Sequence, residues 1–252
     1  LPSLVTDHNR IKQKPAFMLR QINGKIAGRV LDPGDTFTNQ PGRKTHRAED
    51  LATPSAFRRD PKLVWQWYDW RRSLIAACQP NDAHRTLVEM ERGLDDVVLI
   101  TQNVDGLHRL AGSQRVIELH GNIWGQRCTR DCRDPWVDHS LPLSQIPPHC
   151  PACGALARPD IVWFGESLPA AALDAAFDVA QRCDVMLVIG TSALVHPAAS
   201  LPLLALQRSA HVIEINPQPT PLSDAVAQSL RQPAGVGLPR WWANWKQRPS
   251  WP

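Results

Sequence analysis

The sequence has no run of 18 apolar residues and no N-terminal succession of basic, apolar and small residues of the kind that marks a signal peptide. These absences argue against a membrane-spanning or exported chain, so we expect a cytoplasmic protein without a membrane partner. Apolar residues make up 43% and charged residues 21% of the 252 residues. A chain of this length and composition can bury one sizeable core and carry a small second module.

A basic stripe is also missing. The net charge is +4, but residues 1–47 carry nine Lys/Arg and three Asp/Glu, a net of +6, which leaves about −2 for the rest of the chain. A nucleic-acid partner requires positive charge that follows a phosphate backbone. We therefore expect no nucleic-acid partner.

Cysteine is scarce outside one cluster. Four of the six cysteines fall within 26 residues, as the pairs Cys128-x3-Cys132 and Cys150-x2-Cys153. In a chain without an export signal, clustered pairs favour zinc over a disulfide framework. Four thiolate ligands leave no open coordination position, so the sequence predicts one structural zinc ion per chain. The other two, Cys78 and Cys183, have apolar surroundings and are expected to be small buried hydrophobic residues.

From about residue 90 the pattern is regular, and short β-branched runs alternate with helical stretches along the chain. The apolar runs cover 97–100, 185–189 and 212–215, and the helical stretches cover 61–77, 82–92, 170–182 and 198–208. Continuous apolar runs of this length suit strands that are buried on both faces. The alternation predicts an α/β fold with a doubly wound parallel sheet, whose ligand binds beyond the carboxyl ends of the strands.

Five polar motifs lie at or near these predicted ends. Asp105 in the first could be only a helix cap, and His120 in the second could be an ordinary loop histidine. The small residues that begin the fourth suit contact with phosphate or ribose. In chain order the motifs are TQNVDGLH (101–108), ELHGN (118–122), RPDIVWFGE (158–166), GTSALVHPA (190–198) and NPQPT (216–220).

In this order, with the cysteine pairs between the second and third, the motifs closely resemble the sirtuin family of NAD-dependent protein-lysine deacylases. The resemblance implies a Rossmann-like large domain and a smaller zinc-binding and helical module, with NAD and the acylated lysine of a protein substrate meeting in the cleft between them. It implies release of nicotinamide and O-acyl-ADP-ribose. The implied domains are 48–123 with 160–240 (including a helical insertion near 48–80), a zinc module at 124–159 and a Trp-rich tail at 241–252.

The resemblance also implies roles for individual residues. His120 matches the general base, and an imidazole with an ordinary pKa of about 6.5 suits proton transfer at neutral pH. In the family, one strand pairs with the substrate backbone and lines the lysine tunnel. The matching residues here are Val162, Trp163, Phe164 and Gly165. The positions that contact NAD match Gln102, Asn103, Asp105, Gly190, Thr191, Ser192, Asn216 and Ala234.

A finer resemblance concerns the acyl group. Sirtuins that remove succinyl, malonyl or glutaryl groups carry Tyr-x-x-Arg, which matches Tyr68 and Arg71, and Ala48 matches the small residue that makes room. On a helix these two side chains share a face, and an arginine can grip a carboxylate with two hydrogen bonds. The resemblance therefore implies a desuccinylase or demalonylase that could also deacetylate. The alternative is that Arg71 is an ordinary surface residue of an amphipathic helix.

Residues 1–47 depart from the family pattern. The family opens with an apolar strand and a Gly-Ala-Gly-x-Ser loop that cradles the NAD pyrophosphate, and neither is evident here; the family pattern resumes at Ala48. One interpretation is a divergent N-terminal segment, and the other is a disrupted reading frame. Two functions stay open: an active deacylase, or an impaired relative that is stapled by zinc and binds acylated peptide without turnover.

Overall fold

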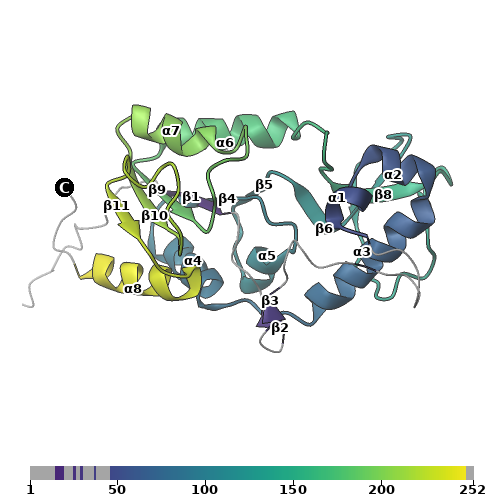
Figure 1. The fold of residues 1–252 in the computed structure, drawn as a ribbon, viewed down its shortest axis with the longest axis horizontal. Helices are drawn as coiled ribbons and strands as arrows, with labels where there is room; N and C mark the ends of the chain where they lie inside the picture. Colours follow the sequence, from purple (N-terminus) through teal and green to yellow (C-terminus); the bar gives the residue numbers. More distant parts are fainter. Residues whose placement is uncertain (1–14, 20–24, 27–28, 31–36, 38–45, 248–252) are drawn as a thin grey trace, which may run out of the picture.

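The computed structural model describes residues 15–19, 25–26, 29–30, 37 and 46–247. Its larger part is built on a six-stranded parallel sheet with the strand order β11-β10-β9-β1-β4-β5 (Figure 1). The predicted parallel α/β fold is confirmed. The strands are β1 (Pro15–Leu19), β4 (Val98–Thr101), β5 (Val116–Glu118), β9 (Val185–Ile189), β10 (His211–Ile215) and β11 (Gln228–Leu230).

Helices cover both faces of this sheet, and the alternation of side chains along β9 shows why. Val185, Leu187 and Ile189 lie in the core cluster that contains residues of α4 and α8. Met186 and Val188 lie in the cluster that contains residues of α6 and α7, on the other face. A strand with an apolar side chain at every position is stable only when both faces are covered. The helices are α4 (Asp82–Gly93), α6 (Ala170–Arg182), α7 (Ser200–Gln207) and α8 (Ala234–Lys246).

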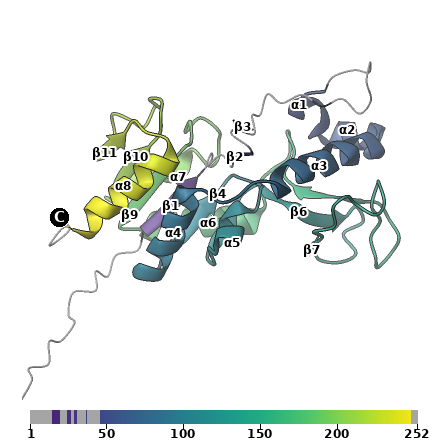
Figure 2. The same cartoon turned by 90° about the horizontal axis from the view of Figure 1, so that it is seen from below.

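Strand β1 occupies the centre of the sheet, between β4 and β9 (Figure 2). The expectation that the first strand of the family is missing is therefore wrong. The backbone of β1 is parallel to both neighbours, with Leu19 opposite Thr101 on one side and Ile189 on the other. Its apolar run is too short to predict a strand alone, but two flanking strands supply partners for its backbone groups. A separate antiparallel pair, β2 (Lys25–Ile26) and β3 (Arg29–Val30), follows it.

The tryptophans near the C-terminus belong to α8. Trp241 and Trp242 are buried in the core cluster shared with α4, and Trp242 Nε1 donates to Glu89 Oε1 at 2.9 Å. Trp251 lies outside the described residues. No helix in the described part of the chain is long and apolar enough to cross a membrane.

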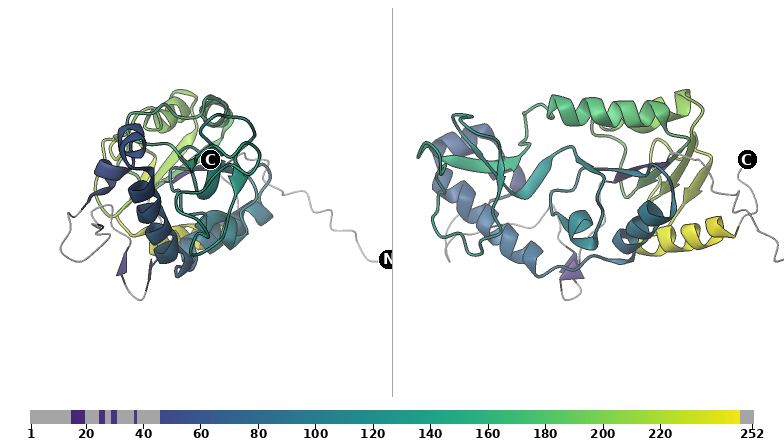
Figure 3. Two further views of the ribbon diagram at one scale, coloured as in Figure 1. Left: turned by 90° about the vertical axis from the view of Figure 1, so that its right-hand side faces the viewer. Right: turned by 180° about the vertical axis from the view of Figure 1, so that it is seen from behind.

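A smaller module forms the end of the molecule opposite α8 (Figure 3). It combines an antiparallel sheet of order β7-β6-β8 with three helices, and α3 is fastened to two of its strands. Trp65 Nε1 donates to the carbonyl oxygen of Ala157, and Arg72 Nε donates to that of Ile123, both at 2.8 Å. The elements are β6 (Gly121–Cys128), β7 (Trp136–Val137), β8 (Ala157–Ile161), α1 (Ala48–Leu51), α2 (Pro54–Arg59) and α3 (Pro61–Ala76).

The four clustered cysteines meet at the far end of this small sheet. Their Sγ atoms all lie within 4.8 Å of one another, with 3.5 Å from Cys132 to both Cys128 and Cys150 and 3.6 Å from Cys128 to Cys153. Tetrahedral zinc with Zn–S bonds of about 2.3 Å requires sulfur atoms separated by about 3.8 Å. The donor set and its spacing therefore fit a four-thiolate zinc ion. Cys78 and Cys183 are buried elsewhere, as expected.

We expect Cys150→Ser to release the metal and unfold the small sheet, because the free energy of metal binding at such a site is folding free energy. Elemental analysis should give one zinc per wild-type chain and much less in the variant, and hydrogen exchange should rise in β6 and β8. The control Cys183→Ala leaves the four thiolates intact and should keep its zinc. Folded wild-type protein without zinc would contradict this assignment.

Candidate active site

All six strands of the large sheet end in one row. The last residues of neighbouring strands are paired with each other, so the row runs Leu230, Ile215, Ile189, Leu19, Thr101 and Glu118. The residues that leave the sheet next are therefore neighbours at one edge. From β1 the chain builds β4 and β5 on one side and then crosses to β9 on the other side, and ligands bind at such a switch in doubly wound folds.

Two polar side chains directly after β4, the buried Gln102 and the half-buried Asn103, each have a buried hydrogen-bonding atom that no other described residue uses. Gln102 Oε1 and Asn103 Nδ2 are both inaccessible to water and have no hydrogen-bond partner among the described residues. The backbone turn itself is held by Thr101, whose Oγ1 accepts from the amide of Asn103 at 3.0 Å. A buried polar atom without a partner costs about 1–3 kcal/mol, so this pair marks a place where a ligand would complete the structure.

His120 follows β5 and is tied to the neighbouring turn. Its Nδ1 lies 3.2 Å from the carbonyl oxygen of Gln102. A carbonyl oxygen only accepts, so in the neutral imidazole Nδ1 carries the proton and the lone pair is on Nε2. The next residue, Gly121, has a φ of 76°, and a Cβ there would lie 2.0 Å from the carbonyl oxygen of Asp160. Only glycine fits this crossing of β6 and β8, which fixes the backbone beside His120.

Asp105 is a half-buried carboxylate in the turn between β4 and α5 (Leu107–Ala111). Loss of solvent around it raises its pKa to about 6, although it accepts a hydrogen bond from the amide of Leu107 at 2.9 Å. Its cap role is therefore real, but the cap does not offset the cost of burying the charge. Trp124 Nε1 donates to the backbone oxygen of Asp105 at 3.1 Å and ties the turn to β6.

His108, in the same motif, does not join this edge. It is 3% exposed, and its ring lies 4.6 Å from that of His84 between α4 and α5. Burial lowers the pKa of His108 to about 3 and that of His84 to about 4, so both rings are neutral at physiological pH. The two histidines belong to the core, whereas His120 contacts the turn after β4 at the edge of the sheet.

The turns after β9 and β10 are joined to each other. Asn216 Nδ2 donates to the carbonyl oxygen of Thr191 at 2.7 Å, and the amide of Gly190 donates to that of Ile215 at 2.9 Å. Gly190 has a φ of 62°, which suits glycine at the sharp exit from the strand. Ser192 follows in the same turn. Ala234 begins α8, four residues after the end of β11, and is buried.

The segment from Val162 to Gly165 bridges the two parts of the molecule. The amide of Val162 donates to the carbonyl oxygen of His120 at 3.0 Å, and that of Phe164 donates to the carbonyl oxygen of Ala52 at 2.9 Å. Trp163 is buried, and its amide donates to Glu166 Oε2, whereas Phe164 is 57% exposed. This segment therefore runs beside His120 with its first three amide donors already engaged.

Tyr68 lies under this segment. Its hydroxyl accepts a hydrogen bond from Trp163 Nε1 at 2.9 Å, and desolvation raises its pKa, so it stays a neutral phenol. Arg71, one helical turn later on α3, interacts electrostatically with both Tyr68 and Asp105 and lies 5.1 Å from the ring centroid of Trp67. Ala48 packs against the same apolar cluster that contains Tyr68 and Trp163.

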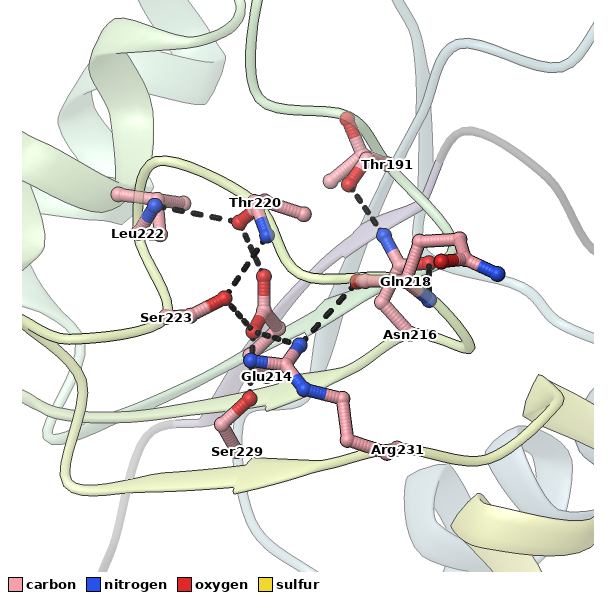
Figure 4. A network of polar contacts seen from close by, with 9 residues as sticks. All are labelled: Thr191, Glu214, Asn216, Gln218, Thr220, Leu222, Ser223, Ser229 and Arg231. Carbon is pink, nitrogen blue, oxygen red and sulfur yellow. Dashed lines mark hydrogen bonds and ion pairs between the residues drawn. The ribbon is translucent and has the colours of Figure 1, made fainter.

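Two ionic contacts beside the site are absent from the sequence-based prediction. Arg158 pairs with Glu166 through two hydrogen bonds of 2.6 and 2.8 Å, and its guanidinium lies 3.5 Å from the ring centroid of Trp163. Glu214 is 1% exposed and forms the centre of a polar network with Arg231 (Figure 4). The sequence feature that could have predicted this network is a single charged residue inside an apolar strand, because a buried charge requires partners.

We expect Asp105→Asn to stabilise the protein at neutral pH. The folded-state pKa of Asp105 lies above its ordinary value, so the wild type loses stability as pH rises from about 4 to about 6. Asparagine keeps the acceptor for Leu107 without the charge. At about 1.4 kcal/mol per pKa unit, urea unfolding should show a gain of about 2–3 kcal/mol at pH 7.5 and about half of it at pH 5. Exposed Asp95→Asn should change little, and an equal gain at both pH values would contradict the assignment.

Known proteins share both sequence and fold with this chain. The Sir2 family model matches residues 42–197. The NAD-dependent protein deacylase of Aquifex aeolicus is 51% identical over 192 residues, which are 76% of this chain and 80% of that protein. A Sir2 homologue solved in complex with NAD is 40% identical, with a TM-score of 0.77 over 94% of this chain and 91% of that chain. Sir2Tm bound to a propionylated peptide is 27% identical, with a TM-score of 0.74 over 93% of this chain and 94% of that chain. On these matches, the chain belongs to the Sir2 family, the sirtuins.

Proposed function

We propose that this protein is an NAD-dependent protein-lysine deacylase that releases nicotinamide and O-acyl-ADP-ribose. The observation that carries the proposal is the position of His120. Its backbone contacts the Val162–Gly165 segment, and its ring contacts the turn that holds the unsatisfied Gln102 and Asn103 atoms. This position would suit a base that acts between a candidate peptide-binding segment and a candidate ligand-binding turn.

The nicotinamide end of NAD would bind at the turn after β4. A carboxamide presents one acceptor and two donor hydrogens, and the buried Gln102 Oε1 and Asn103 Nδ2 offer the matching acceptor and donor. Asp105 in the same turn would lie near the ribose. Its raised pKa fits a carboxylate that contacts hydroxyl groups in a poorly solvated place.

The phosphates and adenosine would lie along the turns after β9 and β10. Gly190, Thr191 and Ser192 form a turn of small residues whose backbone can approach a phosphate closely. Asn216 braces that turn through Thr191, and Ala234 lies in the first turn of α8, whose amides favour negative charge. This half of the site would bind the cofactor through backbone groups.

His120 would act as the general base. After nicotinamide leaves and the acyl oxygen attacks the anomeric carbon of the ribose, a ribose hydroxyl must lose a proton. The Gln102 carbonyl oxygen fixes the Nδ1 proton and thereby keeps the lone pair on Nε2. The catalytic tautomer is therefore set by the fold before substrate binds.

The acylated lysine would enter along Val162–Gly165. Because the amides of Val162, Trp163 and Phe164 are engaged inside the chain, a substrate strand would be held mainly through carbonyl oxygens and Gly165. The exposed ring of Phe164 would cover the apolar stem of the lysine. Relatives solved with acetylated or propionylated peptides support this substrate class.

We further propose a preference for acidic acyl groups. Trp163 Nε1 already donates to the Tyr68 hydroxyl, so the phenol hydrogen is left to donate to a partner. Arg71 interacts electrostatically with Tyr68 and with Asp105, so its charge would lie within reach of an acyl group bound here. Ala48 packs against the cluster that contains Tyr68, and its small side chain would leave room for the acyl group. A succinyl or malonyl carboxylate would accept hydrogen bonds from the Tyr68 hydroxyl and the Arg71 guanidinium. An acetyl group would offer Arg71 no carboxylate.

The residues after β1 lack the family's phosphate-binding motif, so this chain would bind NAD weakly. Leu19 ends between Thr101 and Ile189, so the chain leaves the sheet at the cofactor edge. The next residues read Arg-Gln-Ile-Asn-Gly rather than Gly-Ala-Gly-x-Ser, and 20–24 lie outside the described residues. Hydrogen bonds to a charged phosphate contribute about 1.5–3 kcal/mol each, so losing two or three lowers NAD affinity by about a hundredfold or more.

We expect His120→Ala to abolish NAD-dependent deacylation without changing zinc content or the urea midpoint. The assay should follow acyl-peptide consumption at saturating NAD, in the chain as it is and in a version that carries Gly-Ala-Gly-x-Ser after Leu19. His211→Ala is a matched control, because His211 begins β10 at the opposite edge of the sheet.

Wild-type turnover in His120→Ala would remove His120 from the mechanism. Peptide binding without turnover in both wild-type versions would instead support the impaired relative that binds acylated peptide.

We expect Arg71→Met to weaken desuccinylation by about 2–5 kcal/mol, the usual cost of breaking a buried charge pair, and deacetylation much less. The measurement is kcat/KM for succinyl- and acetyl-lysine versions of one peptide. Arg59→Met, at an exposed position of α2 in the same module, should leave both rates unchanged.

Equal losses of both activities in Arg71→Met would mean that Arg71 supports the fold or the NAD site. Equal and small effects would mean that it faces solvent.

A further inference from the structure

Glu214 is a carboxylate in the middle of a buried apolar strand. It is 1% exposed, and its neighbours Ile213 and Ile215 on β10 are fully buried. Its pKa is nevertheless lowered, because hydrogen bonds from hydroxyl groups and the charge of Arg231 outweigh the effect of burial. A buried charge with this many partners is costly to assemble, and it lies directly before the cofactor edge.

The partners of Glu214 all come from one segment. Oε1 accepts from Thr220 Oγ1, and Oε2 accepts from Ser223 at 2.8 Å, Ser229 at 2.6 Å and Arg231 Nη1 at 3.1 Å. Figure 4 shows these side chains converging on the carboxylate from the loop and strand that follow Asn216. One side chain therefore fastens residues 220–231 at four points.

Hydrogen bonds also join residues within this segment and connect it to the turn after β9. Arg231 Nη1 donates to the carbonyl oxygen of Gln218 at 3.1 Å, and Asn216 Oδ1 accepts from the amide of Gln218 at 3.3 Å. Asn216 Nδ2 then reaches the carbonyl oxygen of Thr191 at 2.7 Å (Figure 4). A continuous chain of hydrogen bonds thus leads from Glu214 through Arg231, Gln218 and Asn216 to the turn after β9.

We propose that Glu214 is a positioning residue that holds Asn216 and the turn at Gly190–Ser192 in the geometry that binds the adenosine half of NAD. The proposal rests on the proposed function for its ligand, but its mechanical part concerns residues of this chain alone. Glu214 itself points into the network and does not need to touch the cofactor. Removing its charge should loosen the loop and turn, raise KM for NAD and leave the chemical step unchanged.

The test uses Glu214→Gln in the full chain. Glutamine keeps the shape, but one of its two acceptors becomes a donor and the charge that pairs with Arg231 is lost. Hydrogen exchange without ligand should accelerate about 10-fold or more in residues 218–231, as expected for a lost charge-assisted hydrogen bond, and also at 190–193. Thr220→Val removes one of the four contacts to Glu214, together with the hydrogen bond that Thr220 Oγ1 accepts from the Leu222 amide, and should cause the same pattern at smaller size.

The kinetic prediction follows from the same variant. KM for NAD should rise about 5- to 20-fold, a usual size for coupling between sites, with kcat and KM for peptide within about twofold. The matched control is Glu89→Gln, which alters a carboxylate bonded to Trp242 and Lys246 on the α4–α8 face. It should change neither exchange at 190–231 nor KM for NAD.

Unchanged exchange at 190–193 in both variants would overturn the proposal, and so would acceleration spread evenly over the sheet, which would mean general destabilisation. Localised exchange changes with an unchanged KM for NAD would overturn the cofactor role of the network. A wild type that shows no NAD binding by calorimetry would refute the proposed function, whereas the exchange data would still decide whether Glu214 positions the turn.

Discussion

The in-register ending of six parallel strands is the constraint on which the rest of the structure depends. Because each last residue is paired with the last residue of its neighbour, the chain can leave the sheet only along one edge. The turns that start at Gln102, Gly190 and Asn216 are brought side by side by this backbone pairing alone. His120 joins them because β5 ends in the same row, opposite Thr101.

Polar side chains at the edge of the sheet differ from Glu214, inside the sheet, in whether they have hydrogen-bond partners and in the direction of their pKa shifts. Glu214, one residue inside the row, has four partners and a lowered pKa. At the edge, Gln102 and Asn103 keep unsatisfied atoms and Asp105 has a raised pKa. Unsatisfied buried polar atoms also occur away from this edge, as in His84, His108 and Arg72, but at the edge they lie where ligands bind in doubly wound folds.

The sequence predicted the elements whose side chains carry their own pattern. The strand at 185–189 and the helix at 170–182 have the expected bounds. A continuous apolar run and an amphipathic spacing are both patterns that a short stretch of sequence displays. Strand β1 was missed, since its four apolar residues become a strand only between β4 and β9. The network around Glu214 was missed for a related reason: its partners are spread over 220–231, and no spacing rule brings them together. The cysteine cluster was predicted because metal ligation imposes a spacing that the sequence displays directly.

The pairing of Gly121 with Ile161 has a consequence for how this architecture can change over time. The chain enters the small module through β6 and returns through β8, so both ends of a 41-residue insertion meet at one antiparallel contact. An insertion with adjacent ends can be lengthened, shortened or exchanged without moving the strands that flank it. The part that holds the cysteine cluster can therefore change in length and sequence while the carboxyl edge of the large sheet stays unchanged. Gly121 does not share this freedom, because any side chain there would collide with the returning strand.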